Sequence, residues 1–596
     1  MEALLIVVVS FVGYLIAYYT YGRFLARKIF RLDDAAPVPS RELQDGIDYV
    51  PTRKGIIFGH HYTSIAGTGP IVGPAIGIIW GWVPALIWVF VGSIVMGAVH
   101  DFSALVMSLR NEGKSMSEIA ARYVSKPART IFFLIAFLEL LIVIAVFGVV
   151  IAAIFNMYPQ SVFPIWCEIP IAVVLGLAIY RWKRNLALST VVAVFAMYVT
   201  VYLGHLETFR FEMGTLTLGG WTLTPTVLWI LILLAYAFVA STIPVTTLLQ
   251  PRDYINAWQL FVAMALLIAG VAGAAFSSQG LHLAAPAVNL SPPADAPPIW
   301  PFLFVTIACG AISGFHCLVA SGTTPKQISK EGDALFVGYG SMLMESALAV
   351  LVIVAVAAGI GMAYEVKAGG KVIETLNGTA AWTHHYASWS AAGGLGQKVE
   401  AVVVGSANMI ASLGIPRSLG IVIMGVFIAS FAGTTLDTAT RIQRYVISEL
   451  ATDFKIKPLS NRWVATAVAV VTAGALAFAA SPKGAGTGAM VLWPMFGAVN
   501  QLLAALALLI ATVYLKRKGS WAYCLTLVPC LFMLVMTLWA MVANQVSFMT
   551  PDRQGHRPWV LVVVNAVTGL VALGLVVEVL RVFAKRPQGS AENRGA

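Results

Sequence analysis

The sequence predicts an all-helical membrane protein with many spans, and its composition, apolar stretches and charge placement support this fold class. Of its 596 residues, 59% are hydrophobic and only 11% are charged, and the mean hydropathy is +0.84. Soluble proteins carry about 25% charged residues. The formal net charge of +11 comes from short clusters of Lys and Arg between apolar stretches, as membrane orientation requires. We therefore exclude a nucleic-acid-binding protein, and no hydrophilic stretch is long enough for a soluble catalytic domain.

About fifteen apolar stretches have the length, about 20 residues, at which a helix crosses a bilayer. The first begins Met1-Glu2 without a basic segment, so we interpret it as a retained span and not as a signal peptide. The predicted spans are 3–22, 59–80, 82–108, 130–155, 163–180, 186–204, 226–249, 257–276, 302–322, 334–362, 418–440, 463–480, 488–514, 520–542 and 558–583.

The distribution of basic residues predicts the orientation. An outside N-terminus and a cytoplasmic C-terminus place about 30 of the 38 lysines and arginines on the inner side. Residues 399–415 are apolar enough for a further span. A crossing there would move the basic residues of 441–462 outside, so we expect an external lid or re-entrant helix instead.

The direction of the spans predicts an inverted repeat. Spans 2 to 6 (56–204) and spans 7 to 11 (226–440) form two five-helix units of opposite direction, an arrangement found in many transporters. The remaining parts are the N-terminal span and loop (1–55), an external lid region (363–417), four C-terminal spans (463–583) and a cytoplasmic tail (584–596).

Span 2 contains a sequence that breaks a helix. Pro70 lacks an amide hydrogen and disfavours helical geometry at Gly69, so the helix should unwind near 67–69. A second half-helix then starts with Thr68 as its N-cap and directs free amides toward a bound carboxylate. We expect Thr68, Gly69, Ile71 and Val72 to bind substrate.

Span 7 carries a similar polar stretch interrupted by Pro244, which predicts a matching break in the second unit. Ser241, Thr242 and Thr246 complete the expected substrate site. The alternative for both stretches is close helix packing, which Gly, Ser and Thr also permit.

Ionisable side chains inside spans are costly and need a reason. A layer of imidazoles with carboxylates can hold a coupling proton; structural, hydrogen-bonded histidines are the alternative. Hydroxyl groups in span 9 are the ligands that a sodium ion would use instead, or Lys326 fills the cation's place as a fixed charge. The sequence leaves proton and sodium both open. The candidate coupling residues are His60, His61, His100, Asp101, His316, Glu345, Ser321 and Thr323.

Four charged residues border the inner side of the spans. Arg252, Asp253, Asp437 and Arg441 have the charges for gating ion pairs, and interfacial anchoring is the alternative reading.

Several long motifs resemble the carbon starvation protein A family over nearly the whole chain. They lie at 58–74, 79–84, 96–101, 250–254, 309–316, 338–345 and 492–501. The resemblance implies a bacterial inner-membrane uptake transporter for peptides, or for pyruvate with a proton, induced by nutrient limitation. It also implies the five-plus-five, leucine-transporter-like fold of the amino acid, polyamine and organocation transporters.

The chain departs from the family pattern at Cys317 and at 323–325, so we do not transfer the relatives' substrate choice. We expect a secondary transporter of small carboxylate-bearing nutrients in contact with membrane lipid, with no enzymatic activity, no cofactor, no metal and no nucleic-acid partner. The alternatives are sodium-coupled or uncoupled transport, a channel or a membrane nutrient sensor; an intramembrane metal enzyme lacks the expected motifs. Oligomeric state is left open.

Overall fold

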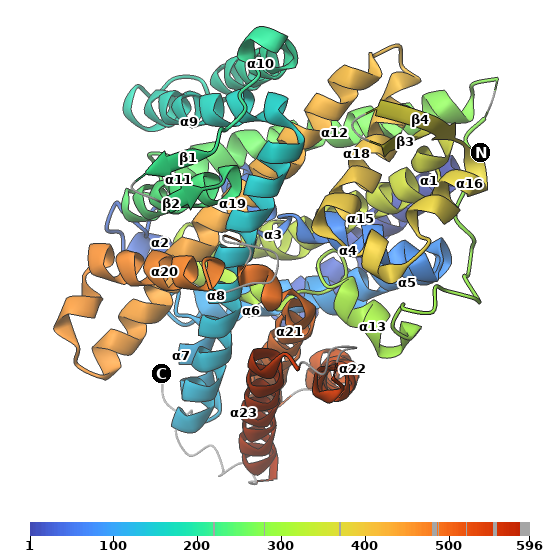
Figure 1. The fold of residues 1–596 in the computed structure, drawn as a ribbon. Coiled ribbons are helices and arrows are strands. Elements are labelled where there is room, and N and C mark those ends of the chain that lie inside the picture. Colours follow the sequence, from blue (N-terminus) through green and yellow to red (C-terminus); the bar gives the residue numbers. More distant parts are fainter. Residues whose placement is uncertain are drawn as a thin grey trace, which may run out of the picture.

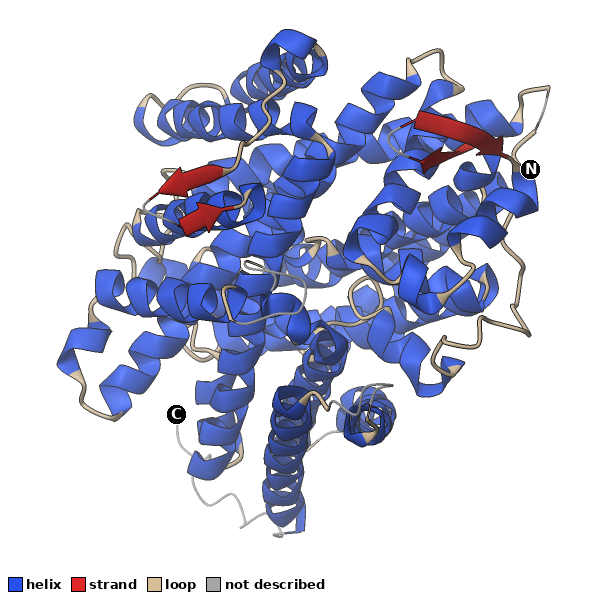
Figure 2. Ribbon diagram, in the orientation of Figure 1, coloured by secondary structure: helices blue, strands red, loops and turns tan. Residues whose placement is uncertain are grey.

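The computed structural model describes residues 1–584 except 219–220, 279, 369–370, 480–485, 487, 520 and 552–556. The predicted cytoplasmic tail therefore lies outside the described residues from 585 onward. The described chain is a helical bundle with two small β-hairpins at its periphery (Figure 1, Figure 2).

The first ten helices extend to the end of the predicted first unit, 56–204. They are α1 Glu2–Ala17, α2 Pro39–Glu42, α3 Lys54–Ile65, α4 Gly69–Gly77, α5 Trp82–Gly92, α6 Ala98–Leu109, α7 Met116–Tyr123, α8 Lys126–Met157, α9 Val162–Gly176 and α10 Leu186–His205. Short π-helical turns extend α1, α5 and α9, so each forms part of a longer span.

The remaining helices follow the first hairpin. They are α11 Pro225–Thr242, α12 Leu249–Ala275, α13 Ile299–Thr306, α14 Gly314–Gly322, α15 Gly340–Ala357, α16 Gly378–His385, α17 Trp389–Ala392, α18 Leu395–Ala411, α19 Arg417–Asp453, α20 Arg462–Ala477, α21 Trp493–Arg517, α22 Cys524–Met549 and α23 Trp559–Ala584.

Among the described residues, twelve helices are long and apolar enough to cross a membrane, or 13 if the bent pair α3–α4 counts as one span. Two predicted spans do not pass this test. The predicted span 302–322 is divided into α13 and α14, and the span at 463–480 is the 16-residue α20. The many-spanning helical class is therefore confirmed, whereas the number fifteen stays a prediction.

Two long helices, α8 and α19, pack against each other at the centre (Figure 1). Ser125 caps the start of α8 by accepting the Ala128 amide, as Ser does at N-caps. α8 is almost continuously apolar, which fits a helix surrounded by other helices on most sides. This central pair forms one wall of the region in which the broken helices lie.

The two hairpins lie in loops that the sequence predicted to be outside. β1 Leu216–Leu218 pairs antiparallel with β2 Trp221–Leu223, and β3 Tyr364–Ala368 pairs with β4 Lys371–Leu376. The sequence analysis did not predict these strands. The second hairpin precedes α16, α17 and α18. The 17-residue α18 is not among the span candidates of the described chain, and its external position stays a prediction.

Candidate functional site

The first broken helix is present where the sequence predicted it. α3 ends at Ile65, α4 begins at Gly69, and the two helix axes differ by 44°. Pro70 occupies the first turn of α4, where its missing amide hydrogen costs nothing. Thr68 is the N-cap residue as expected, although its side chain makes no capping hydrogen bond.

A second break lies in the predicted span 9, between α13 and α14. The chain leaves the helix at Ile307 and re-enters it at Gly314, with Gly310 at a φ of +87°, which a glycine adopts easily. The sequence analysis placed the second break at 241–247 instead. That placement is wrong, because α11 ends at Thr242 and Pro244 lies in the turn before α12, not inside a span.

The two breaks touch each other. A Cβ atom built on Gly69 would lie 2.3 Å from Cys309 Sγ, and one on Gly67 would lie 2.3 Å from Thr435 Oγ1. Glycine is therefore required at both positions by the close approach of a neighbouring side chain. The unwound segment 66–68 is packed between the second break and α19, and it does not face lipid.

A cavity of about 20 Å³, roughly the room for one water molecule, lies at this junction. Thr68, Gly69 and Val72 line the cavity among the expected substrate residues, whereas Ile71 is buried nearby but does not line it. Its other walls come from α8, the second break, α19 and α21: Val143, Phe147, Cys309, Phe315, Thr435, Trp493, Phe496 and Asn500, together with Ile65 and Gly67.

The remaining expected substrate residues lie elsewhere. Ser241 donates to the Asp437 carbonyl (3.2 Å), Thr242 donates within its own helix, and Thr246 lies in the turn before α12. None of the three lines the cavity, since the helix break that would have placed them there is absent.

Side chains of α21 complete the second break. Asn500 Oδ1 accepts the Phe315 amide (2.8 Å), and its Nδ2 donates to Ser313 Oγ (3.0 Å). Gln501 Nε2 donates to the Phe304 carbonyl (2.8 Å). Broken backbone inside a membrane needs such partners, so α21 belongs to the core that holds the site.

A chain of buried titratable side chains, joined by hydrogen bonds and by one ion-pair contact, approaches the second break. His100 Nδ1 lies 2.8 Å from Asp101 Oδ1, and Asp101 Oδ2 lies 3.0 Å from His316 Nδ1. His316 Nε2 lies 3.3 Å from Glu345 Oε2, and Glu345 Oε1 accepts the Gly310 amide (3.1 Å). The structure thus joins four of the expected coupling residues, all buried, in one relay from α6 through α14 to α15.

The other expected coupling residues do not join this relay through hydrogen bonds among the described residues. His60 Nδ1 lies 2.5 Å from Asp253 Oδ2, and His61 Nδ1 lies 2.8 Å from Thr324 Oγ1. Ser321 donates to the Cys317 carbonyl (2.7 Å), and the Thr323 hydroxyl has no partner in the described chain.

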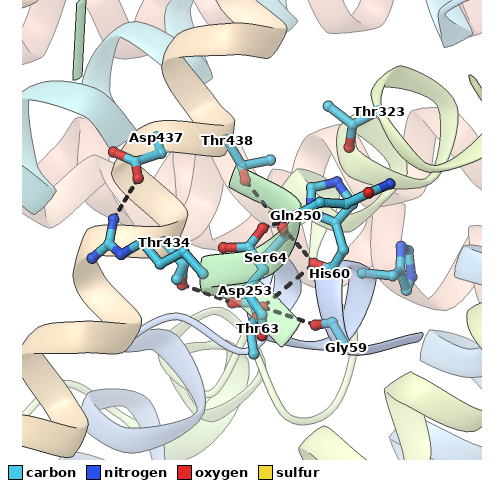
Figure 3. Close-up of polar contacts among 12 residues, drawn as sticks. Gly59, His60, Thr63, Ser64, Gln250, Asp253, Thr323, Thr434, Asp437 and Thr438 are labelled. Carbon is cyan, nitrogen blue, oxygen red and sulfur yellow. Dashed lines mark hydrogen bonds and ion pairs between the residues drawn. The ribbon is translucent and has the colours of Figure 1, made fainter. Parts of the chain in front are cut away.

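A cluster of oxygen atoms surrounds the end of α3, next to the His60 pair. Figure 3 shows the side chains of α3, α12 and α19 that converge there. Ser64 Oγ lies 3.0 Å from Thr438 Oγ1, and Thr434 Oγ1 donates to the Thr63 carbonyl (3.3 Å). These hydroxyls from α19 are a set that the sequence analysis missed, because their helix is distant in the chain.

Three of the four expected gating residues belong to two buried networks, whereas Asp253 pairs with His60. In the first, Arg252 contacts Glu168 (2.7 Å), Asp437 and the Tyr236 hydroxyl (2.7 Å). Asp437 also accepts from Tyr236 (2.8 Å). Glu168 on α9 is a partner that the sequence analysis missed, although it lies inside the predicted span 163–180.

In the second network, Arg441 and Arg444 of α19 hold Asp48, which precedes α3 (2.7 and 2.8 Å). Burial by itself would raise the pKa of Asp48, but these two guanidinium groups hold the pKa down at about 2. Asp48 lies in an irregular loop, and nothing in the local sequence indicated its partners.

The loop that carries Asp48, residues 45–53, is also held by backbone hydrogen bonds. We call it the Asp48 loop. The amides of Val50 and Thr52 donate to the Lys326 and Gln327 carbonyls (3.0 and 2.9 Å), just after α14. The Val245 amide donates to the Ile47 carbonyl (3.0 Å). The loop therefore connects the chain before α3 and α12 and the chain after α14 to the C-terminal half of α19, on one side of the cavity.

Lys326, whose carbonyl accepts the Val50 amide of the Asp48 loop, also makes contacts through its side chain. Its Nζ donates to the Gly322 carbonyl (2.7 Å) and lies 3.9 Å from the centroid of the Tyr445 ring. Burial lowers the pKa of Lys326 to about 8. These contacts place the ammonium group beneath the Asp48 loop.

The other side of the cavity is covered by the lid region. The Tyr386 hydroxyl donates to the Ala75 carbonyl of α4, and the Trp389 ring lies 5.5 Å from that of Trp80. Asp295 accepts the amides of Trp389 and Ser390 (2.8 and 2.9 Å). The cavity is thus closed from both sides.

The chain is similar in sequence to members of a single protein family. Residues 2–540 match the family model described as carbon starvation protein CstA. The chain is 32% identical to the peptide transporter CstA of Campylobacter jejuni over 96% of this chain and 83% of the relative. It is also 32% identical to the pyruvate/proton symporter BtsT of Escherichia coli, over 91% of this chain and 81% of that protein.

Solved structures give a weaker likeness. A manganese transporter of Eremococcus coleocola matches with a TM-score of 0.42 and 13% identity, over 90% of this chain and 99% of that one. MhsT in complex with L-phenylalanine matches with a TM-score of 0.44 and 13% identity, over 83% of this chain and 98% of that one.

Proposed function

Because this chain belongs to the carbon starvation protein CstA family, we propose that it is a secondary uptake transporter for small nutrients that carry a carboxylate. Peptides and pyruvate are the candidate substrates, since relatives of similar identity carry those names. The protein is a transporter and not an enzyme. The bacterial relatives and the many apolar helices support a bacterial inner-membrane location. The Lys and Arg distribution supports an outside N-terminus and a cytoplasmic C-terminus.

One observation carries this proposal: two broken helices meet at a closed cavity between two blocking layers. Gly69 lines this junction at the first position of α4, so its amide and the positive end of the helix dipole lie there and favour an anionic group, whereas the Ile71 and Val72 amides donate to the Thr68 carbonyl. The cavity is far smaller than a peptide, so binding requires that the Asp48 loop or the lid move away. Alternate opening of the two layers gives transport.

We propose that a proton is the coupling ion and that the relay from His100 to Glu345 holds it. Glu345 contacts the amide of Gly310 inside the second break, so its charge affects the geometry of the substrate junction. Imidazoles change charge near physiological pH, and a neighbouring carboxylate can set where they do so.

Sodium is the second candidate ion, because the hydroxyls of Ser64, Thr434 and Thr438 gather at the unwound end of α3. Hard cations prefer oxygen ligands, and carbonyls freed by the break would add to them. In the structure, the Ser64 and Thr434 hydroxyls donate to helix carbonyls, which leaves their oxygen lone pairs as ligands that a cation would use.

We also propose that all fifteen predicted stretches cross the membrane and that ten of them form an inverted repeat. Helix packing supports a division into two repeat units that differs from the division predicted from span direction alone. In this division, each broken helix is the first helix of its unit. The same contacts recur in the two halves. α3 packs on α12, and its counterpart α13 packs on α21. α4 packs on α15, and its counterpart α14 packs on α6. α8 packs on α20 as α19 packs on α11.

In this division, the first half is α3–α4, α5–α6, α8, α11 and α12. The second half is α13–α14, α15, α19, α20 and α21. The hairpin of α9 and α10 is then an insertion in the first half, and it lies at the edge of the bundle (Figure 1).

Counterflow in proteoliposomes tests the proposal. We expect labelled pyruvate or a labelled dipeptide to accumulate against unlabelled substrate in a saturable manner, and an imposed inward proton gradient to drive net uptake without sodium. Uptake driven only by a sodium gradient would move the coupling to the α3–α19 hydroxyls. Unsaturable flux, or no flux of either substrate, would contradict the transporter proposal.

A further inference from the structure

A groove of about 890 Å³ opens on the lateral periphery of the helical bundle, between α10 and α12. It lies away from the cavity, and its lining contains three basic residues, Arg53, Lys183 and Arg184, and no acidic residue. The rest of the lining is Asn185, Leu186, Ala187, Thr190, Val191, Val194, Phe195, Tyr254 and Trp258.

The basic residues gather at one end of the groove. Lys183 and Arg184 lie in the turn between α9 and α10, and Arg53 directly precedes α3. All three are exposed, and in the described part of the chain none of them forms an ion pair with a carboxylate. α10 also begins here, and the Asn185 side chain accepts only the Leu188 amide among the first amides of that helix. This end of the groove is therefore strongly positive and without a counter-charge.

The rest of the groove is apolar and open to the membrane. Phe195 is 70% exposed and Trp258 is 41% exposed, and together with Val191 they form its walls. At its base, the Thr190 hydroxyl lies 3.3 Å from the Tyr254 hydroxyl. From Arg184 to Phe195 the groove follows α10 for roughly 16 Å, about half of the hydrocarbon thickness.

We propose that this groove binds one anionic phospholipid. Its basic end matches the phosphate headgroup, and its apolar walls match the upper part of an acyl chain at the depth expected within one leaflet. Basic pockets between membrane helices on the side richer in Lys and Arg are suited to anionic headgroups. Neither a soluble anion nor a zwitterionic lipid matches both ends equally well.

The position of the groove gives the lipid a structural consequence. Arg53 is the N-cap residue of α3, and α3 packs so closely on α12 that a Cβ at Gly59 would lie 3.2 Å from Tyr254 Cα. A headgroup bound to Arg53, Lys183 and Arg184 would connect the start of α3 to the α9–α10 hairpin. The lipid would then hold the Asp48 loop side closed. This consequence rests on the proposed transport function, whereas binding itself does not.

Lipid retention by the full-length protein tests the proposal directly. The protein is purified in a mild detergent, incubated with phosphatidylglycerol or phosphatidylcholine, and examined by native mass spectrometry and thermal unfolding. We expect phosphatidylglycerol adducts and a higher Tm, with little effect of phosphatidylcholine. Glycerol 3-phosphate and inorganic phosphate, which lack acyl chains, should leave the Tm unchanged; stabilisation by either alone would overturn a lipid site in favour of a phosphate site.

Variants locate the binding. Each basic side chain near an anionic headgroup contributes about fivefold in affinity, so R53Q/K183Q/R184Q should weaken phosphatidylglycerol retention by at least about tenfold. The matched control K455Q/K457Q/R462Q removes the same charge from another loop between spans and should retain the lipid as the wild type does. Equal retention by both variants, or equal loss from both, would overturn the proposal. Neither measurement requires transport, so failure of the transport assay leaves this test intact.

Discussion

The Sγ atom of Cys309 fills the space in which a side chain at Gly69 would begin. A Cβ on Gly69 would lie 2.3 Å from Cys309 Sγ and 2.5 Å from Cys309 Cβ. The two residues are 240 positions apart in the sequence, and each belongs to a different broken helix. Their contact therefore ties the two breaks together, and a side chain added at Gly69 must displace Cys309.

Adding a side chain at Gly69 should consequently abolish transport with modest effects on folding. We expect Gly69→Ala to lower uptake by roughly tenfold or more, because overpacking at a well-packed site costs about 1–3 kcal/mol. Gly69→Leu should remove uptake altogether. Initial rates of labelled substrate uptake, with membrane expression as the reference, measure the effect.

Gly148→Ala is the matched control, because a Cβ at this α8 position meets nothing within 4 Å. It should transport normally. The double variant Gly69→Ala/Cys309→Gly restores the space and should recover part of the uptake. Normal transport by Gly69→Leu would contradict a binding site at the junction.

The relay makes a prediction about Glu345. Glu345→Gln removes the carboxylate that contacts His316 Nε2 while keeping a group that can accept the Gly310 amide. We expect net uptake driven by a proton gradient to be lost, whereas substrate exchange continues, and the pH dependence of exchange to become flat. Exchange and gradient-driven uptake measured between pH 5.5 and 8.5 separate the two effects.

Glu139→Gln is a suitable control for Glu345. Glu139 is also buried, on α8, and its carboxylate has no hydrogen bond in the described part of the chain. Its variant should keep the wild-type pH profile. A pH profile that Glu345→Gln leaves unchanged would exclude Glu345 from coupling.

The Asp48 loop should open when its ion pairs are removed. Asp48→Asn leaves Arg441 and Arg444 without their carboxylate, a loss of about 1–3 kcal/mol for charged hydrogen bonds with one partly exposed partner. We expect amide hydrogen exchange over residues 45–53 to become about tenfold faster or more. Glu42→Gln, at an exposed position just before the loop, should leave the exchange unchanged.

The same ion pairs predict how the loop responds to acid. The folded-state pKa of Asp48 is about 2, below its ordinary value near 4, so its contribution to stability is complete above about pH 4 and is lost only as the pH falls toward 2. The difference in exchange between the wild type and Asp48→Asn should therefore be the same at pH 5.5 and at pH 7.5, after correction for intrinsic exchange. A difference that disappears by pH 5.5 would show that Asp48 is not held by both arginines.

The sequence predicted the span positions and the first break because both depend on local chemistry. Apolar length fixes a span, and Pro70 beside Gly69 disrupts a helix wherever it lies. The second break has no proline within 307–313, and its signal was only Gly310, Ser313 and Gly314 within an apolar stretch. Pro244 gave a stronger local signal but lies in a turn between helices, where proline is equally acceptable.

The partners of the buried charges required the tertiary structure. His100 and Asp101 adjoin in sequence, but His316 and Glu345 reach them only because α14 and α15 pack near α6. Glu168 and Asp48 lie far from Arg252 and Arg441 in the chain, and a single sequence carries no information on such pairs. The hydroxyls of α19 escaped notice for the same reason.

The Arg252 network should be sensitive to the shape of the cation and not only to its charge. Arg252 contacts Glu168 through Nε, and through Nη1 both Asp437 and the Tyr236 hydroxyl. A lysine carries the same charge on a single nitrogen and cannot bridge these groups in one plane. Arg252→Lys should therefore leave one buried carboxylate poorly paired and lower the Tm in detergent by several degrees, since breaking a buried ion pair costs about 3–5 kcal/mol at most. Arg181→Lys, at an exposed position near the end of the same span as Glu168, should leave the Tm unchanged. If Arg252→Lys unfolds at the wild-type temperature, charge alone holds α9, α12 and α19 together, and the bridging geometry is not required.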